Sequence, residues 1–351
     1  MYNFRTLTFL TFIMLVFSAC SPDESSASDN PGYVVSLSEV KKENALNDDL
    51  QLLGTIGNVI MLTDTKWILM DNSPGVYLFE DYVMAMSFGE PGKGPCEFEE
   101  ISAIDATDDQ VFVMDATQTK IITYDMKSGE CVGEINQKDL QGAYYLFKEE
   151  NKPSFITANT SYMMMTPDST KLVHRIFENE NSEPLDLSFQ EIDAAKSMVT
   201  LRSNLMDFQQ HANKLYFYLP LTDDLHVLNL ENDAIHAFPL QIDVKKKELE
   251  NAGGEVNRIL EIIRGDFDFM TKILVHDEWI AIQVNRQSAK EDEDSNPFLQ
   301  FYTHDGNFIA EIPIDHKVLG VQENSLIFLK ESSDPNSKFT HFVEYRDVIM
   351  E

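Results

Sequence analysis

Alternating hydrophobic and polar residues recur in short runs along most of this chain. The clearest example is the segment 88–125, where a Gly/Pro-rich loop precedes runs at 101–105, 110–115 and 119–125. Asp, Thr and Gln separate the runs. Alternation of this kind is typical of a strand with one buried face, and these polar residues favour tight turns. The segment is therefore predicted to form a meander of antiparallel strands.

The predicted strands sort into groups of four, and a four-stranded meander repeated around an axis forms a β-propeller. The groups span 57–88, 101–136, 140–177, 205–241, 269–313 and 317–345. The third group, with strands expected at 140–148, 154–158, 161–165 and 171–177, is poorly defined. An irregular stretch at 178–204 follows it, which leaves seven blades as the main alternative. We expect an all-β propeller of six blades.

The last group has three strands, at 317–321, 325–330 and 339–345, and so lacks one. Near the N-terminus, Tyr33–Val40 (YVVSLSEV) reads as a strand without a partner of its own. Pairing it with the last blade would close the ring and remove the exposed edges of an open array. We expect this N-terminal strand to complete the sixth blade.

One stretch, Asp243–Gly265, breaks the β pattern. It is rich in Lys, Glu, Leu and Arg, which are good helix formers, and apolar residues between Val256 and Ile263 recur at helical spacing. Gly253-Gly254 is expected to interrupt the helix. We predict a helical insertion between blades four and five, whose apolar stripe either covers the central funnel or packs on the rim.

The N-terminal segment has the features of a secretory signal. Arg5 is its only charged residue, and the apolar run Leu7–Phe17 is too short to span a bilayer as a helix. Small residues then precede Cys20, as in a bacterial lipobox, where cleavage precedes the Cys and its sulfur is acylated. We expect residues 1–19 to be a lipoprotein signal peptide and Cys20 to carry the anchor. The alternative is an ordinary signal peptide with an incidental Cys.

Composition separates the tether from the folded body. Residues 20–32 are small and polar with Pro and Gly, so they cannot bury enough apolar surface to fold and are expected to form a flexible tether. Residues 33–351 are expected to form the propeller. The chain carries a net charge of −32. Phosphate binding needs clustered cations, so nucleic acid is disfavoured as a partner, and membrane contact is expected through the lipid anchor only.

The segment 88–125 also carries a family resemblance. A loop close to G-x-G-K-G-P-G-E-F, followed by V-F-V-x-D and K-I-x-x-Y-D, resembles the six-bladed NHL- and TolB-like propellers found as lipoproteins in Bacteroidetes. The resemblance implies a propeller anchored by lipid in the bacterial outer membrane, facing the periplasm or the cell surface. It does not name a substrate.

Within the loop Gly89–Glu100, the run GEPGKG invites comparison with a phosphate-binding loop. A P-loop requires four residues between its first Gly and the Gly-Lys pair, then Ser or Thr and a helix, whereas Pro and a strand follow here. The resemblance instead implies a blade-linking loop anchored by Glu97 and Phe98, in which Cys96 replaces the usual Gly. If the loop also binds a ligand, Lys93 is its only cation.

With Cys20 lipidated, Cys96 and Cys131 are the remaining cysteines. The topology of the resembling family places Cys96 in a linker on one face of the propeller and Cys131 after a turn on the opposite face. Two Cα atoms more than about 7 Å apart cannot be bridged without backbone movement. We expect two free thiols.

Two exceptional linkers, Gly89–Glu100 and Asp243–Gly265, are predicted to share one face, and this face is the candidate for ligand contact because long loops on a rigid scaffold commonly carry function. Lys245, Lys246 and Lys247 add cations there that could attract an anionic ligand such as an acidic glycan. The alternative is a solvated helix face whose lysines only improve solubility.

Asp71 and Asp115 each end the second strand of a blade, in WILMD and VFVMD. Asp favours such positions because its side chain bonds the backbone two residues on. We expect structural roles for both. The functional alternative is a ring of carboxylates that holds a cation at the channel mouth.

The eight His show no metal-ligating spacing, and no G-x-S-x-G elbow is present. No metal or other cofactor is predicted. Sites can also assemble from distant blades, so the lack of motifs disfavours an enzyme without excluding one. We expect a binding or interaction module for a glycan, a peptide or an envelope protein, with a propeller hydrolase or lyase at the channel mouth as the alternative.

Overall fold

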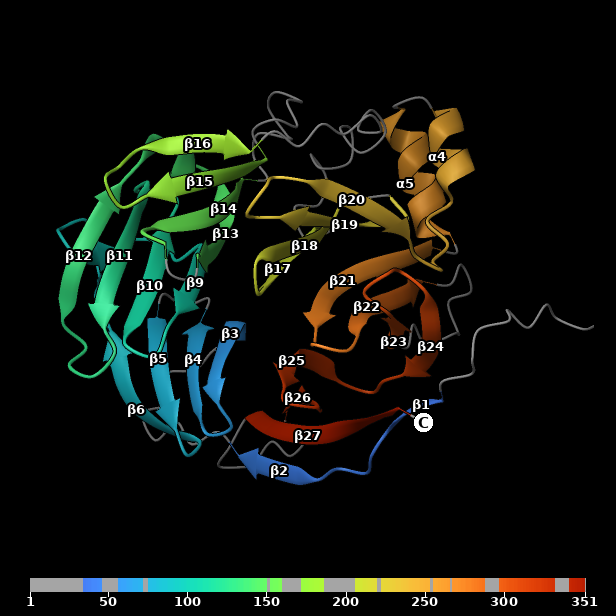
Figure 1. Cartoon of the computed structure of the whole chain (residues 1–351), viewed down its shortest axis with the longest axis horizontal. Coiled ribbons are helices and arrows are strands. Elements are labelled where there is room, and N and C mark those ends of the chain that lie inside the picture. Colours follow the sequence, from blue (N-terminus) through green and yellow to red (C-terminus); the bar gives the residue numbers. More distant parts are fainter. Residues whose placement is uncertain are drawn as a thin grey trace, which may run out of the picture. The chain divides into compact units, whose positions relative to one another are not determined.

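Six antiparallel sheets surround a common axis and form the six predicted blades (Figure 1). The structure is a computed structural model, and it describes residues 34–45, 56–71, 75–149, 152–159, 172–185, 206–219, 222–252, 255–265, 267–287, 297–331 and 341–350. The predicted signal peptide, Cys20 and the tether lie outside the described residues.

Blades one to three contain four strands each, paired in chain order. Blade one contains β3 (Ile56–Thr63), β4 (Lys66–Asp71), β5 (Gly75–Glu80) and β6 (Val83–Phe88). Blade two contains β9 (Ala103–Ala106), β10 (Gln110–Asp115), β11 (Lys120–Asp125) and β12 (Cys131–Asn136). Blade three contains β13 (Ala143–Lys148), β14 (Ser154–Asn159), β15 (Val173–Phe177) and β16 (Ser182–Leu185).

Blades four and five repeat this order, and blade six differs because its outer positions come from the N-terminus. Blade four contains β17 (Asp207–His211), β18 (Lys214–Tyr218), β19 (Asp224–Asn229) and β20 (Ile235–Pro239). Blade five contains β21 (Phe267–Val275), β22 (Ile280–Gln287), β23 (Pro297–Tyr302) and β24 (Phe308–Pro313). Blade six contains β25 (Lys317–Gln322), β26 (Ser325–Glu331), β27 (His341–Met350), β1 (Val35–Leu37) and β2 (Lys42–Ala45).

The N-terminal strand completes the last blade, as predicted. It consists of two short pieces, since β1 pairs Val35 with Met350 and β2 pairs Lys42 with Tyr345 on the same strand, β27. The long edge of β27 is thus covered by both pieces, which removes an exposed edge where another chain could pair.

Blade three corrects part of the strand assignment. The predicted strand at 161–165 lies outside the described residues, and the segment predicted as the fourth strand, 171–177, contains the third strand, β15. The fourth strand, β16, comes from the stretch 178–204 that was assigned as irregular. The alternative of a seventh blade in that stretch is wrong. Asn179 and Glu180 form the turn of a short hairpin between β15 and β16, and Glu180 has a left-handed backbone conformation. Because β15 is mostly buried and β16 is mostly not, the sequence of β16 does not show the alternation expected of a strand.

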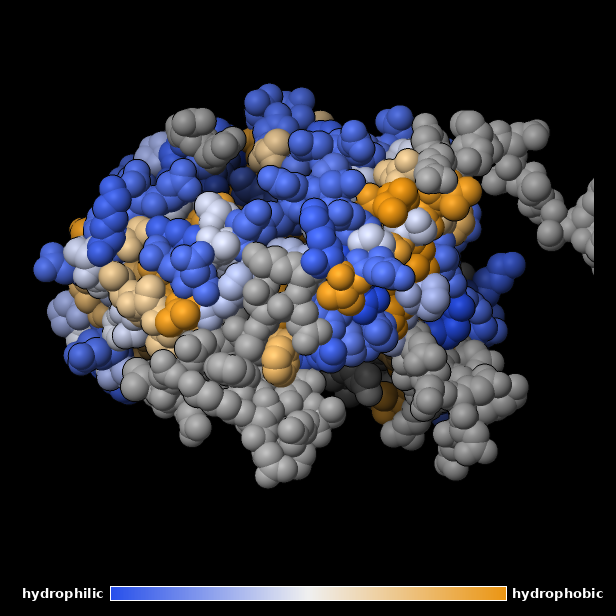
Figure 2. All heavy atoms as spheres, turned by 90° about the horizontal axis from the view of Figure 1, so that it is seen from below, coloured by the Kyte–Doolittle hydropathy of each residue, from blue (hydrophilic) through white to orange (hydrophobic). Residues whose placement is uncertain are grey.

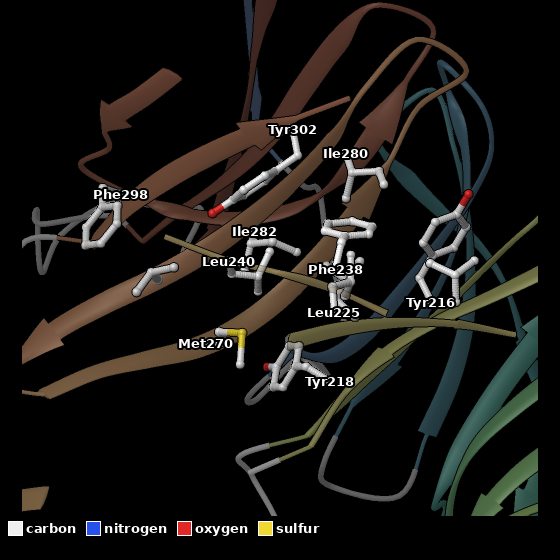
Figure 3. Close-up of a cluster of buried hydrophobic side chains, with 13 residues drawn as sticks. Tyr216, Tyr218, Leu225, Phe238, Leu240, Met270, Ile280, Ile282, Phe298 and Tyr302 are labelled. Carbon is white, nitrogen blue, oxygen red and sulfur yellow. The ribbon is translucent and has the colours of Figure 1, made fainter. Parts of the chain in front are cut away.

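Each pair of neighbouring blades encloses its own cluster of buried apolar side chains. Figure 3 shows the cluster between blades four and five, where Phe238 and Leu240 meet Ile280 and Ile282. Burial of such side chains contributes about 1.5–3 kcal/mol each before the opposing entropy is counted. These sheet-to-sheet contacts hold the blades in the ring.

The ring closes through aromatic side chains of blades one and six. Trp67 is buried against Tyr82 and Tyr345, and the Tyr82 hydroxyl donates to the Tyr345 hydroxyl at 3.1 Å. The Tyr345 hydroxyl in turn donates to the Asp64 carbonyl at 3.0 Å, and the Tyr82 hydroxyl oxygen lies 3.2 Å from the same carbonyl oxygen. Buried hydroxyls need such partners, so this network specifies how the first and last blades meet.

The helical insertion is present as two short helices, α4 (Lys246–Ala252) and α5 (Val256–Arg264), on either side of the predicted interruption. Ile259 and Ile263 of α5 are buried against Leu249, Ala252 and Phe267. The helices lie at the outer edge of the ring beside β20 and β21 (Figure 1), so the stripe packs on the rim and does not cover the centre.

On the side of the ring that Figure 2 shows, the coloured residues are mostly hydrophilic, with hydrophobic residues in separate groups. In the part of the chain that the structure describes, no helix is long and apolar enough to cross a membrane.

Candidate functional site

The inner strands of all six blades line a central cavity of about 1500 Å³. These strands are β3, β9, β13, β17, β21 and β25. Successive side chains of a strand point to opposite faces, so each inner strand offers only a few side chains to the cavity. The lining is therefore a mixture of apolar, aromatic, amide and charged groups contributed by separate blades.

One group of charged side chains lies where the chain enters the inner strands from the linkers. Asp207 is the first residue of β17 and Lys317 is the first residue of β25, while Lys272 lies on β21 between them in the ring. Asp207 interacts electrostatically with both lysines. Three consecutive blades thus bring two ammonium groups and one carboxylate to the linker end of the cavity.

The Asp207 carboxylate also holds the wall together. It accepts the Ile273 N–H of the next blade at 2.6 Å, and it accepts the N–H of Phe208. Burial raises the pKa of Asp207 to about 6 against the opposing effects of Lys272 and these hydrogen bonds. Burial lowers the pKa of Lys272, an effect that Asp207 opposes and that Lys317 strengthens.

Asp105 on β9 repeats the arrangement between blades two and three. Its carboxylate accepts the Lys148 N–H of β13 and the Ala106 N–H, and burial raises its pKa to about 7. Asp105 and Asp207 therefore have the same structural role, in which a carboxylate on one inner strand binds the backbone of the next, although Asp105 lies nearer to the turn end of its strand.

Two amide side chains in the cavity wall have oxygen atoms without a partner. Gln210 Oε1 on β17 and Asn285 Oδ1 on β22 are buried and accept no hydrogen bond from the described residues. The NH₂ group of Gln210 donates to the Ala212 carbonyl at 3.4 Å, so only the oxygen of that amide lacks a partner. Unsatisfied buried polar groups are uncommon, which makes these two amides candidate ligand contacts.

Tyr144 on β13 supplies an aromatic surface. It lines the cavity and is 47% exposed, whereas most large hydrophobic side chains of the inner strands are buried. Tyrosine combines a flat apolar ring with a polar hydroxyl, and such residues are enriched at binding surfaces.

The three candidate residues of the linker Gly89–Glu100 mainly stabilise the conformation of that linker. Glu97 accepts the Gly94 N–H at 2.7 Å, and Phe98 is buried in the cluster between blades one and two. Lys93 is an exposed side chain paired with Glu99 at 2.9 Å, and this hydrogen bond raises the pKa of Lys93. Among the described residues that line the cavity, none of these three is present.

Asp115 is fully buried and binds the same loop. Its carboxylate accepts the N–H groups of Glu99, Glu100 and Gln118, and it accepts the side-chain amide of Gln118 as well. These bonds give Asp115 the predicted structural role. Asp71 is also buried, at the equivalent end of β4, and neither carboxylate lines the cavity.

The expectation of two free thiols is wrong, because Cys96 and Cys131 form a disulfide with a Cα–Cα distance of 6.0 Å. The linker does not stay on its face of the propeller. It packs on the face of blade two that is turned toward blade one, where Lys120 Nζ donates to the Gly94 carbonyl and the Tyr124 hydroxyl donates to the Cys96 carbonyl. Cys96 has a φ of 61°, the left-handed region that favours Gly.

The lysines of the helical insertion are spread along its start. Lys245 is paired with Asp243, and Lys247 is exposed on α4. Lys246 begins α4, and its side chain lies outside the described part of the structure. None of the three lines the cavity. They remain candidate contacts on the rim, and the two exceptional linkers do not meet over the channel.

Histidine and acidic residues do not gather into a metal-binding group of three or more anywhere in the described residues. His226 stacks on Phe217, and burial lowers its pKa to about 4. EDED at 291–294, which resembles a calcium loop only in charge, lies outside the described residues.

Sequence reasoning did not identify the cavity residues Tyr144, Asp207, Lys272 and Lys317. Each lies on a predicted innermost strand, so the signal was their place in the blade rather than any motif. Asking which residues of each first strand face the axis would have selected them.

Comparison with known proteins agrees with this architecture. Residues 47–247, more than half of the chain, match the family DUF5128, described as a 6-bladed beta-propeller. The chain belongs to this family. None of the curated proteins compared with it matches its sequence.

Solved structures similar to this DUF5128 chain include a candidate exported protein from Bacteroides fragilis. Its TM-score is 0.62 at 9% sequence identity, and the match covers 93% of this chain and 98% of that chain. A protein of unknown function from Bacteroides caccae has a TM-score of 0.46 at 12% identity, with 81% and 94% covered. At 9% identity the likeness to the Bacteroides fragilis protein shows the fold alone.

Proposed function

We propose that this protein is an extracytoplasmic binding module, of the NHL- and TolB-like kind, that takes its ligand into the central channel. The observation that carries the proposal is the cavity of about 1500 Å³ with its mixed lining, because ligand sites combine apolar walls with a few placed polar groups. The partner would be a glycan, a peptide or an extended segment of an envelope protein.

The location rests on separate support. The apolar run before Ser18-Ala19-Cys20 is typical of a lipoprotein signal, and a structural neighbour from Bacteroides fragilis is a candidate exported protein. We infer that Cys20 carries the lipid and that residues 20–32 tether the propeller to the outer membrane, on its periplasmic or outer side.

A hydrolase or lyase is the second candidate, and the raised pKa values of Asp105 and Asp207 favour it, because perturbed carboxylates gather at active sites. Against it, each carboxylate already accepts backbone N–H groups that join two blades. Burial alone accounts for most of both shifts, so binding is the better supported function.

The test begins with a thermal-shift screen of the purified chain against neutral and acidic oligosaccharides and peptides, since a compound that binds the native state raises the melting temperature. Compounds that raise it are then measured with Tyr144→Ala and with Val132→Ala as the control, because Val132 is an exposed residue on an outer strand. The proposal expects at least a tenfold loss of affinity in the first variant alone.

Equal affinities in the two variants would contradict a site in the channel. Mass spectrometry of each bound compound after incubation decides between the two functions. Recovery of the unchanged compound supports a binding module. Conversion of many molecules of the compound by each protein molecule would identify an enzyme.

A further inference from the structure

Two ammonium groups in the central cavity have no ion-pair partner among the described residues. They belong to Lys272, which is half-buried on β21, and Lys317, which is exposed at the start of β25. The third lysine of the lining, Lys148, differs from them because its Nζ donates to the carbonyls of Lys152 and Ser154.

The carboxylates near these lysines are already occupied. Asp207 accepts the Ile273 N–H, and Asp315, which precedes Lys317 by two residues, pairs with Arg346 at 3.3 Å. Asp207 lies close enough to interact with both lysines but forms no ion pair with either among the described contacts. The linker end of the cavity therefore holds two positive charges against one carboxylate that is bound to the backbone.

The carboxylates that blade two contributes to the cavity lining either accept hydrogen bonds from other groups or lie far from the two lysines. Glu100 accepts the Thr117 hydroxyl, and Asp105 accepts the N–H groups of Ala106 and Lys148. Asp108 follows β9 in its turn toward β10, at the opposite end of the cavity. None of them neutralises Lys272 or Lys317.

This local excess of positive charge is unusual in a protein whose net charge is −32. Like charges held together in a partly desolvated site repel each other, and an anion placed between them removes that repulsion. The wall also carries Asn285 on β22, two residues beyond Gln283, which pairs with Lys272, and the Asn285 amide oxygen has no partner among the described residues. The NH₂ group of this amide can donate to an anionic oxygen.

We propose that the channel binds the anionic group of its ligand between Lys272 and Lys317, with Asn285 as a neutral donor. The chemistry is that of a carboxylate, sulfate or phosphate group, carried by an acidic glycan or present as a free ion. This inference rests on the proposed function and specifies the ligand class for the same cavity.

The test uses isothermal titration of the purified full-length chain with four probes: sodium sulfate, inorganic phosphate, a galacturonate trisaccharide and the methyl ester of that trisaccharide. The ester keeps the sugar and removes the charge. The double variant Lys272→Met/Lys317→Met keeps most of each aliphatic stem. The control, Lys127→Met/Lys247→Met, makes the same change in net charge at exposed positions outside the cavity.

The expected result is that at least one anionic probe binds, that the channel variant weakens it at least tenfold, and that the control does not. Lys272→Arg/Lys317→Arg should retain more affinity than the Met variant, because the charge is kept. Binding of sulfate or phosphate without the trisaccharide identifies a free-ion site, and preference for the trisaccharide over its ester identifies an acidic glycan.

Absence of binding by all three anionic probes would overturn the inference, and so would equal affinity in the channel and control variants. The proposed function is judged separately. Suppose that a neutral compound binds and that its affinity depends on Tyr144 but not on the two lysines. This result would support the channel as a binding site and would refute the proposal that its ligand is anionic.

Discussion

The carboxylate of Asp207 accepts the N–H of Ile273 at 2.6 Å and thereby joins the inner strands of blades four and five inside the channel. Asp105 makes the equivalent bond to Lys148 between blades two and three. Since both carboxylates lie in the cavity wall, the groups that hold the channel in shape are also the groups that respond to pH there.

Stability should depend on pH through Asp105, whose pKa is raised to about 7 in the folded protein. Between the unfolded value near 4 and pH 7, the native state binds more protons, so the contribution of this group to the free energy of unfolding is lost as pH rises, by at most about 1.4 kcal/mol per pH unit. Asp105→Asn should remove that part of the slope. Urea unfolding at pH 5 and pH 8 measures it.

Asp108→Asn is the matched control, because Asp108 is an exposed residue of the adjoining turn. A slope that Asp108→Asn and Asp105→Asn change equally would show that general charge repulsion, and not the buried carboxylate, sets the pH dependence.

The disulfide between Cys96 and Cys131 should contribute substantially to stability, since it closes a loop with a sequence separation of 35 residues. A loop of that length corresponds to about 3–4 kcal/mol in the chain-entropy account. Cys96→Ser/Cys131→Ser should lower the free energy of unfolding by an amount of that order. Thiol titration of the denatured wild type without reductant should find neither of these two cysteines free.

Cys96→Gly/Cys131→Ser gives a sharper comparison. Cys96 has a φ of 61°, and Gly adopts this conformation without the cost of about 1–2 kcal/mol that other residues incur. The Gly variant should therefore be the more stable of the two double variants. Titration of both thiols in the wild type would contradict the disulfide.

Closure of the ring should depend on the N-terminal strands β1 and β2. Deleting residues 34–45 exposes the edge of β27 and leaves backbone groups unpaired, each at a cost of about 1–3 kcal/mol when it stays buried. We expect aggregation or a melting temperature lowered by at least about 5 °C, because the loss of a few kcal/mol shifts the melting temperature of a domain this large by about 1.5–2 °C per kcal/mol. A chain that begins at residue 34 is the control and should melt like the mature protein. Normal melting of the deletion would show that the ring closes in another way.

Cys20 should determine membrane association. Cys20→Ala should move the protein from the membrane fraction to the soluble fraction without a change in melting temperature, because the propeller begins after the tether. Ser21→Ala is the control and should stay in the membrane fraction. A Cys20→Ala protein that remains membrane-bound after a carbonate wash would contradict lipid anchoring.

The alternating patterns were sufficient to predict the propeller, the closing strand and the helical insertion, because strand periodicity and turn residues are local properties of the sequence. Blade three was harder, since its hairpin is interrupted between β14 and β15 by a long connection. The disulfide was missed because the path of a linker depends on side chains from another blade, such as Lys120 and Tyr124.

The cavity residues show the same limit. Lys272 and Asp207 are 65 positions apart in the sequence, and only the packing of blade four against blade five brings their strands together. No sequence motif indicates that residues so far apart lie close together. The sequence could therefore indicate that the inner strands face a channel, but not which charged side chains lie near one another in it.

The central claim is that the channel around Tyr144 is the binding site, and fluorescence tests it most directly. Both native tryptophans, Trp67 and Trp279, are buried at 1% and 0% exposure, so Tyr144→Trp adds an accessible indole inside the channel. Acrylamide quenching is measured with and without each compound that raises the melting temperature, and Val132→Trp serves as the control on the outer strand. We predict that the compound protects the indole at position 144 from quenching and leaves the one at position 132 unprotected. Binding without protection at position 144 would contradict the account.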